Sequence, residues 1–112
     1  GRKIGEFQVL QHRMVDIAIA CEEARAITYA ALAQFERSPE ATRRAISAAK
    51  VRVAQTSRFV GQQAVQLHGG IGTSDELIVS HYLRRLAMLE VRFGNADHHL
   101  QRFAEMPLSL AA

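Results

Sequence analysis

The chain has 112 residues, one cysteine, a hydrophobic fraction of 48%, a charged fraction of 22% and a formal net charge of +3. This length allows one domain at most, and the single cysteine excludes an internal disulfide and favours a reducing compartment, so we expect a cytoplasmic location. No apolar run approaches the roughly 20 residues that cross a bilayer, so no transmembrane segment is expected, and the opening residues lack the apolar segment of a signal peptide.

The net positive charge raises the question of a nucleic-acid partner. The densest basic stretch, residues 43–58, spaces its charges at helical intervals and contains no aromatic residue. This pattern favours a solvated helix face over a phosphate-binding stripe. We therefore expect no nucleic acid among the partners.

The first half of the chain predicts two long helices. Helical spacing of apolar residues indicates a first helix from Glu6 to Phe35, with one predicted inward stripe: Leu10, Met14, Ile17, Cys21, Ala24, Ala31 and Phe35. Ser38 can cap a second helix that begins at Pro39 and runs to about Leu67. Its predicted stripe is Ile46, Ala49, Val53, Val60, Ala64 and Leu67. Two such helices joined by a short turn form an antiparallel hairpin.

Three glycines, Gly69, Gly70 and Gly72, end the second helix. Thr73 and Glu76 then have the spacing of a capping box, and a third helix is predicted to about Arg92. Its inward residues would be Leu77, Ile78, Tyr82, Leu86 and Leu89. Gly94 breaks it, Asn95 can cap a fourth helix from Ala96 to about Glu105, and Pro107 should end the order. The predicted fold is all-α, an antiparallel four-helix bundle.

The glycine segment, residues 69–72, has two physical interpretations. Bare backbone can turn sharply and approach a flat or charged group closely, and amides around Thr73 and Ser74, if they open the third helix, could face an anion. Alternatively, the glycines are a helix C-cap followed by a tight turn. The spacing alone leaves both open, and it matches neither a Walker loop nor a Rossmann fingerprint.

Two separated motifs carry a family resemblance. "QLHGGIG", followed by an acid-rich helix start and "HYLRR", resembles the Gln-x-x-Gly-Gly-x-Gly segment of the acyl-CoA dehydrogenase family, and "GRKIGEFQVLQHRMVDI" resembles an earlier stretch of the same family. Members of the family are flavoenzymes with a helical domain, a β-barrel and a C-terminal helical bundle. The resemblance covers essentially the whole chain, so residues 1–112 are expected to be the C-terminal bundle of a larger three-domain flavoenzyme.

The resemblance implies FAD as the cofactor. Gln66, Gly69 and Gly70 would lie against its adenosine-pyrophosphate part, held mainly by a neighbouring subunit, and Phe7 and Gln8 match positions that touch FAD across the dimer interface. Asn95 and Asp97 match positions that hydrogen-bond FAD, although both could equally cap the last helix. The expected partners are a neighbouring acyl-CoA dehydrogenase subunit in a homo- or hetero-oligomer, an acyl-CoA substrate and an electron-transfer acceptor.

The chain departs from the family at the catalytic base. Counting from Arg84 without gaps places Phe93 at the glutamate that removes the α-proton, and a phenyl ring accepts no proton; Glu90 is most of a turn away and is not a substitute. No catalytic residue is therefore assigned. "FGNADHHLQRF" resembles small subunits of two-component, pimeloyl-CoA dehydrogenase-like enzymes, in which a partner could supply the base. Alternatives are a base upstream of Gly1, or a non-catalytic helical interaction bundle.

For several other side chains the sequence favours a structural role over a metal-binding or substrate-binding one. Adjacent His98 and His99 point about 100° apart on a helix and do not suit one metal ion, so no metal site is expected and one histidine should pack while the other meets solvent or cofactor. Cys21 is predicted in the core. Arg84 and Arg85 could reach a CoA phosphate, but a structural salt bridge across the bundle is favoured.

Overall fold

A computed structural model describes residues 1–35 and 37–106 of the chain. The described residues contain no strand, so the predicted all-α class is confirmed. Pro107, which was expected to end the helical order, lies outside the described residues. In chain order the elements are the 3₁₀ turn η1 (Ile4–Glu6), α1 (Gln8–Ala33), α2 (Pro39–His68), the 3₁₀ segment η2 (Gly69–Thr73), α3 (Ile78–Val91) and α4 (Ala96–Glu105).

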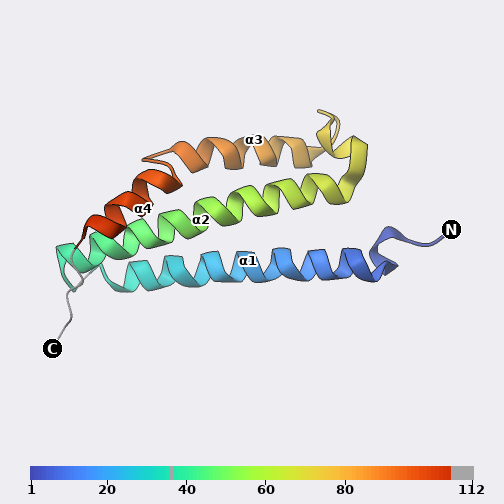
Figure 1. Ribbon diagram of the computed structural model, residues 1–112. Coiled ribbons are helices and arrows are strands. Elements are labelled where there is room, and N and C mark those ends of the chain that lie inside the picture. Colours follow the sequence, from blue (N-terminus) through green and yellow to red (C-terminus); the bar gives the residue numbers. More distant parts are fainter. Residues whose placement is uncertain (36, 107–112) are drawn as a thin grey trace.

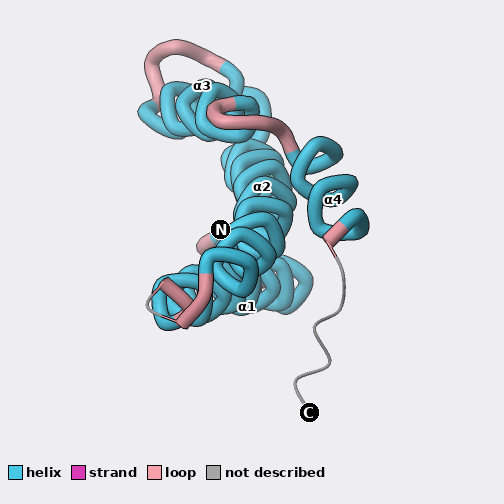
Figure 2. The backbone as a smooth tube through the Cα atoms, turned by 90° about the vertical axis from the view of Figure 1, so that its left-hand side faces the viewer, coloured by secondary structure: helices cyan, strands magenta, loops and turns pink. Residues whose placement is uncertain are grey.

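Helix α2 lies at the centre of the arrangement. α1 runs antiparallel along one side of it, which confirms the predicted hairpin, and α3 and α4 follow one another along its other side (Figure 1). Seen from the side in Figure 2, α1, α2 and α3 form successive layers, and α4 lies beside α2. The result is an elongated molecule of 62 × 27 × 21 Å. α2 is therefore the scaffold on which the other helices are positioned.

Side chains cap the starts of α2 and α4, and a glycine ends α2. Ser38 Oγ accepts a hydrogen bond of 3.1 Å from the Ala41 amide, and Pro39 opens α2. Gly69, at the C-cap of α2, has φ = +64°, a left-handed conformation that favours glycine. Asn95 Oδ1 accepts from the His98 amide at 2.9 Å and begins α4. The predicted starts of α2 and α4 are confirmed, as is the glycine C-cap.

The predicted capping box at the start of α3 is wrong. The N-cap of α3 is Leu77, which makes no side-chain cap. Thr73 Oγ1 donates instead to the Gly70 carbonyl at 2.9 Å, and the Ser74 amide donates to the Ile71 carbonyl at 3.1 Å. Short hydroxyl side chains compete with helix formation by bonding nearby backbone, so the 3₁₀ segment continues through Thr73. The amides of Thr73 and Ser74 consequently do not open a helix toward an anion.

The predicted stripe of α1 is partly wrong. Met14, Cys21 and Phe35 are exposed, so Cys21 is not a core residue. The residues of α1 that are buried or half-buried include four of the predicted stripe and two that were not predicted, Ala20 and Ile27. They are Leu10, Ile17, Ala20, Ala24, Ile27 and Ala31. α1 carries apolar side chains around most of its circumference, so periodicity alone could not select the contact face. Small side chains on that face allow close approach to α2, where Thr56 Oγ1 donates to the Ala20 carbonyl at 3.4 Å.

Two basic residues of α2 hold the C-terminal ends of α3 and α4. Lys50 Nζ donates to the carbonyl oxygens of Leu89 and Glu90 at 3.0 and 3.3 Å. Arg44 Nη1 donates to the Met106 carbonyl at 2.8 Å, and its guanidinium lies 4.0 Å from the centre of the Phe103 ring. Both therefore satisfy carbonyls left free at a helix end. Part of the basic stretch that was predicted to be a solvated face thus has a structural role.

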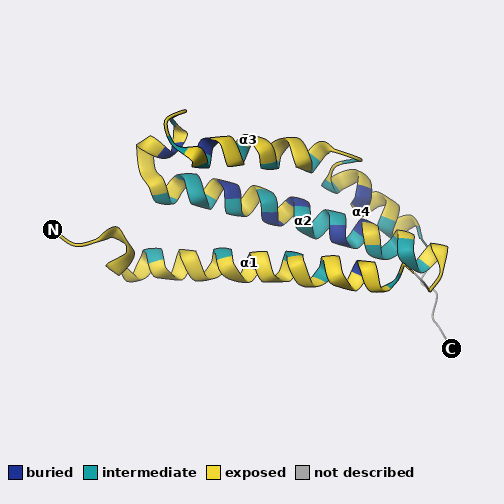
Figure 3. Ribbon diagram, turned by 180° about the vertical axis from the view of Figure 1, so that it is seen from behind, coloured by how far each residue is buried: buried dark blue, intermediate teal, exposed yellow. Residues whose placement is uncertain are grey.

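Apart from His99, the buried residues of the described chain have small side chains or none. Buried positions gather on α2 (Figure 3), and the largest fully buried side chain is Ser47. Large apolar side chains remain exposed on α1 and α3: Val15, Ile19, Tyr29, Leu32, Ile78, Tyr82 and Met88. Soluble monomers rarely leave extended apolar surface uncovered. The described residues thus leave many large apolar side chains uncovered.

None of the helices among the described residues is long and apolar enough to cross a membrane.

Candidate functional site

Five of the seven predicted site residues lie at one end of the α1–α2 hairpin. Phe7 and Gln8 begin α1, Gln66 lies in the last turn of α2, and Gly69 and Gly70 open η2. In an antiparallel hairpin the start of the first helix and the end of the second must adjoin, and Figure 1 shows both at the same end. All five residues are exposed. We call this set the glycine-loop end.

Two of the three glycines of η2 are required by the fold of the described chain, each for a different reason, and the third is not. Gly69 has the left-handed backbone of the α2 C-cap. Gly72 is buried, and a Cβ there would lie 2.5 Å from the Val65 carbonyl oxygen. Gly70 has no left-handed backbone, is exposed, and a Cβ on it would meet nothing within 4 Å. The packing of the described chain explains the absence of a side chain at Gly72 but not at Gly70.

The start of α1 adds positive potential at the glycine-loop end. α1 has no side-chain N-cap and no acidic residue in its first turn, so its first amides are free to meet an anion. Glu6, just before the helix, pairs with Arg2 at 3.6 Å. The Arg2 guanidinium lies 5.3 Å from the centre of the Phe7 ring, and Lys3 precedes η1. Gln11 Nε2 fixes η1 by donating to the Gly5 carbonyl at 2.9 Å. The first amides of α1 and the charge of Lys3 suit an anionic group such as a diphosphate, whereas Arg2 is paired with Glu6.

A polar clamp fixes the segment between η2 and α3. Arg84 Nη1 donates to Asp75 Oδ1 at 2.7 Å, and Arg84 Nη2 lies 3.0 Å from His81 Nδ1. The hydrogen bond and the positive charge of Arg84 lower the pKa of the Asp75 carboxyl below its ordinary value of 3.8. The favoured salt bridge of Arg84 is thus present, but it joins the loop to α3 rather than crossing the bundle.

Asn95 and Asp97 do not join the glycine-loop end. They lie at the opposite end of α3 (Figure 1), whose 14 residues span about 21 Å. Asn95 uses its side-chain oxygen to cap α4, as one of its two interpretations predicted. The predicted residues therefore fall into two groups, one at each end of α3.

The turn between α3 and α4 holds the position where the resemblance places a catalytic base. Phe93 has φ = +62°, and it is 82% exposed. A left-handed conformation costs a residue with a side chain about 1–2 kcal/mol. Glu90 forms an ion pair with Arg58, so it is committed to a contact with α2.

His99 lies buried beneath this turn, and its contacts with α2 and with the turn were not predicted from the sequence. His99 is 4% exposed and approaches Ser47 on α2 and the Phe93 carbonyl, whereas His98 is exposed, so the expectation that one histidine packs is confirmed. The two rings meet edge to face with centroids 5.1 Å apart. No cluster of three or more potential metal ligands occurs among the residues that the structure describes.

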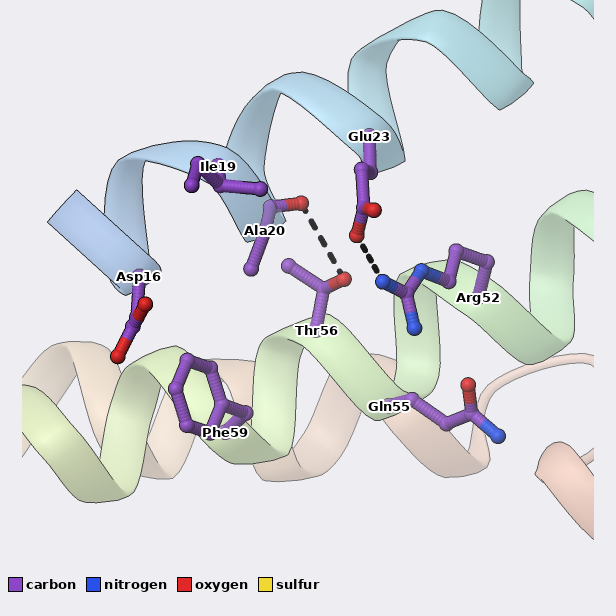
Figure 4. A pocket seen from close by; sticks show the side chains of 8 residues that line it. All are labelled: Asp16, Ile19, Ala20, Glu23, Arg52, Gln55, Thr56 and Phe59. Carbon is purple, nitrogen blue, oxygen red and sulfur yellow. Dashed lines mark hydrogen bonds and ion pairs between the residues drawn. The ribbon is translucent and has the colours of Figure 1, made fainter.

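Two grooves of the described chain lie away from the predicted site residues. One groove of about 360 Å³ crosses the middle of the α1–α2 interface, where Arg52 pairs with Glu23 (Figure 4). Its lining is Asp16, Ile19, Ala20, Glu23, Arg52, Gln55, Thr56 and Phe59. Another of about 400 Å³ is largely apolar and lies near the hairpin turn, beside Leu32 and Ile46. The glycine-loop end is accordingly an exposed surface in the described chain.

Comparisons with known proteins bear on this surface. The family model for the C-terminal domain of acyl-CoA dehydrogenases matches residues 1–106. The chain is 35% identical over 85 residues to the acyl-CoA dehydrogenase IpdE2 of Mycolicibacterium smegmatis, covering 76% of this chain and 25% of that protein. It is 32% identical over 94 residues to a probable acyl-CoA dehydrogenase, fadE25, of Mycobacterium leprae, covering 84% and 24%.

A human relative, the mitochondrial short-chain specific acyl-CoA dehydrogenase, is 28% identical over 98 residues, covering 87% of this chain and 23% of that protein. The chain thus spans about a quarter of the length of these relatives. No solved structure matches it at a significant level.

Proposed function

The chain belongs to the acyl-CoA dehydrogenase family, whose C-terminal domain it matches over residues 1–106, and we propose that it closes a cofactor site in an FAD-dependent acyl-CoA dehydrogenase. The complete enzyme would remove hydrogen from the α- and β-carbons of an acyl-CoA thioester. When bound, FAD would accept the β-hydride. The role of this chain would be to bind and orient the cofactor at a subunit interface.

Gly70 is the observation that supports this proposal. Neither backbone conformation nor packing within the described chain calls for a glycine at this exposed position. A close neighbour outside the chain would call for one, since backbone without Cβ admits closer approach. Gln66, Gly69 and Gly70 would line the adenosine diphosphate part of FAD, while Phe7 and Gln8 would contact it from the start of α1. Asn95 and Asp97 remain proposed contacts, at the other end of α3.

We propose that this subunit lacks its own catalytic base. Phe93 replaces the expected glutamate, and Glu90 is paired with Arg58. A partner subunit of a two-component enzyme would then supply the carboxylate that accepts the α-proton. The rival arrangement places a base upstream of Gly1 in the same polypeptide. A non-catalytic interaction bundle is the other alternative.

The exposed apolar side chains of α1 and α3 support an oligomeric setting. They would be covered by other parts of the full-length protein or by a neighbouring subunit, in a homo- or hetero-oligomer. An electron-transfer acceptor would reoxidise the flavin. We keep the cytoplasm as the proposed location, which the single unpaired cysteine supports.

Substitution of Gly70 tests the proposal. In the full-length protein, co-expressed with a glutamate-bearing partner, Gly70→Glu should abolish FAD retention, because a negative side chain would occupy the space of the diphosphate. Gly70→Ala should weaken retention without unfolding the protein. The ratio of flavin absorbance to protein absorbance after gel filtration measures both. Full flavin content in Gly70→Glu would overturn the proposed contact.

A colourless wild-type complex would favour the non-catalytic bundle. The same preparation therefore separates the two classes of function before any variant is made.

A further inference from the structure

The groove of about 360 Å³ in the middle of the α1–α2 interface has two ends that differ in charge. At one end Glu23 of α1 pairs with Arg52 of α2. Asp16 precedes Glu23 by seven residues, and Phe59 follows Arg52 by seven. Because the helices run antiparallel, equal steps along both keep the same register, so Asp16 lies at the level of Phe59. One carboxylate of the groove therefore meets a guanidinium, whereas the other meets a ring.

Asp16 is the carboxylate without a counter-charge. It is exposed and forms no ion pair with any described residue, although Arg13 is only three positions away on the same helix. The lining of the groove contains two carboxylates and one guanidinium, so one negative charge is left over. Figure 4 shows the Asp16 carboxylate and the Phe59 ring at the same end of the groove, extending from α1 and α2. This end of the groove is thus suited to a cation.

The Phe59 ring adds a second attraction for the same cation. It is 38% exposed, and the face of an aromatic ring attracts a cation within about 6 Å of its centre. Within the described chain Phe7 and Phe103 each have an arginine guanidinium over the ring, whereas Phe59 has none. Ile19, which is 53% exposed, adds an aliphatic edge to the groove. A carboxylate, a ring and an aliphatic side chain together match the guanidinium and the methylene groups of an arginine.

We propose that this end of the groove receives an arginine side chain of a neighbouring subunit. The inference rests on the proposed function for the existence of that subunit. A planar guanidinium pairs with Asp16 and stacks on Phe59 at once, which a compact ammonium does less well. A free small cation would gain little, since an exposed ion pair is weak in water. An arginine on a subunit is one contact among many, and the exposed side chains of Val15 and Ile19 supply apolar surface around it.

Photocrosslinking in the full-length protein, co-expressed with a glutamate-bearing partner, tests the occupant. p-Benzoylphenylalanine is incorporated in place of Ile19, at the edge of the groove, which leaves Asp16 and Phe59 intact. Irradiation should join two polypeptides, and the crosslinked residue of the second should lie within one helical turn of an arginine. Crosslinks within one polypeptide only, crosslinks remote from any arginine, or no crosslink at all would each overturn the proposal.

Removal of the charge tests the pairing. Asp16→Asn keeps the shape of the side chain and breaks no ion pair of the described chain, so it should fold like the wild type. Dissociation of the subunits should become about tenfold faster, because the guanidinium loses its carboxylate. Glu22→Gln is the matched control, since it removes one charge from an exposed residue of the same helix that pairs with Arg25 and does not line the groove.

Exchange with isotope-labelled subunits, followed by native mass spectrometry, measures the dissociation rate. Phe59→Leu, which keeps an apolar side chain and removes the ring, should accelerate dissociation severalfold. Equal rates in Asp16→Asn and Glu22→Gln would overturn the role of Asp16.

The flavin content of the wild-type protein reports separately on the proposed function. A colourless complex that still gives the crosslink would refute the cofactor site and support the arginine contact. A yellow complex without the crosslink would refute the contact alone.

Discussion

The contrast between Gly70 and Gly72 gives a quantitative prediction from the geometry of one loop. A Cβ at Gly72 would lie 2.5 Å from the Val65 carbonyl oxygen and 3.0 Å from His68 Cβ. The carbonyl belongs to the last turn of α2 and cannot move without disturbing it, so Gly72→Ala should cost about 1–3 kcal/mol, as overpacking does. A Cβ at Gly70 meets nothing within 4 Å. Gly70→Ala should therefore stabilise the apo-protein by about 0.4–1 kcal/mol through the unfolded chain.

Hydrogen exchange of the flavin-free full-length protein measures this difference locally. The two variants should differ by about 1.4–4 kcal/mol at the end of α2, which corresponds to a tenfold to several-hundredfold difference in exchange rate. Peptides from α1, remote from η2, serve as the internal reference. Equal exchange in the two variants, or faster exchange in Gly70→Ala, would refute the assignment of Gly72 to packing and Gly70 to an external contact.

Three further predictions concern other parts of the chain. Lys50→Met should destabilise the protein by about 1–2 kcal/mol in urea unfolding, because the carbonyls of Leu89 and its neighbour lose their donor; an unchanged midpoint would contradict the capping role. The pKa of Asp75 is lowered, so its ionised form is favoured in the folded state. The carboxylate therefore contributes to the free energy of unfolding at pH values above the unfolded-state pKa, near 3.8. This contribution is lost as the pH falls through the lower folded-state pKa. Asp75→Asn should thus be less stable than wild type at neutral pH and converge with it in acid, whereas a constant difference would exclude the ion pair with Arg84 as the cause. In a complex whose partner carries glutamine in place of its catalytic glutamate, Phe93→Glu should increase acyl-CoA-dependent flavin reduction by about 100-fold or more; no increase in stopped-flow absorbance would favour a base upstream of Gly1.

Helix ends were predictable where one side chain determines them. Ser38 with Pro39 and Asn95 with Gly94 are local signals, and the structure places α2 and α4 at the predicted starts. The start of α3 was not predictable in the same way. Thr73 has two possible hydrogen-bond partners within reach, and the 3₁₀ conformation of η2 decides in favour of the Gly70 carbonyl.

Contact faces and long-range polar pairs were less accessible from the sequence. Cys21 lies on an apolar stripe of α1, but α1 has several such stripes and packs on α2 through its alanines. The Ser47–His99 pair joins residues 52 positions apart, and neither residue type indicates the other. The resemblance identified Gly69, Gly70 and Gly72 together, whereas their separate roles follow only from the backbone conformation and the space at each.

The structure of the flavin-loaded complex, determined by cryo-electron microscopy, would test the central claim most directly. The account predicts that the adenosine diphosphate part of an FAD held mainly by the neighbouring subunit lies in van der Waals contact with Gly70. A Gly70 that faces solvent, or that is covered by protein side chains far from any nucleotide, would contradict it.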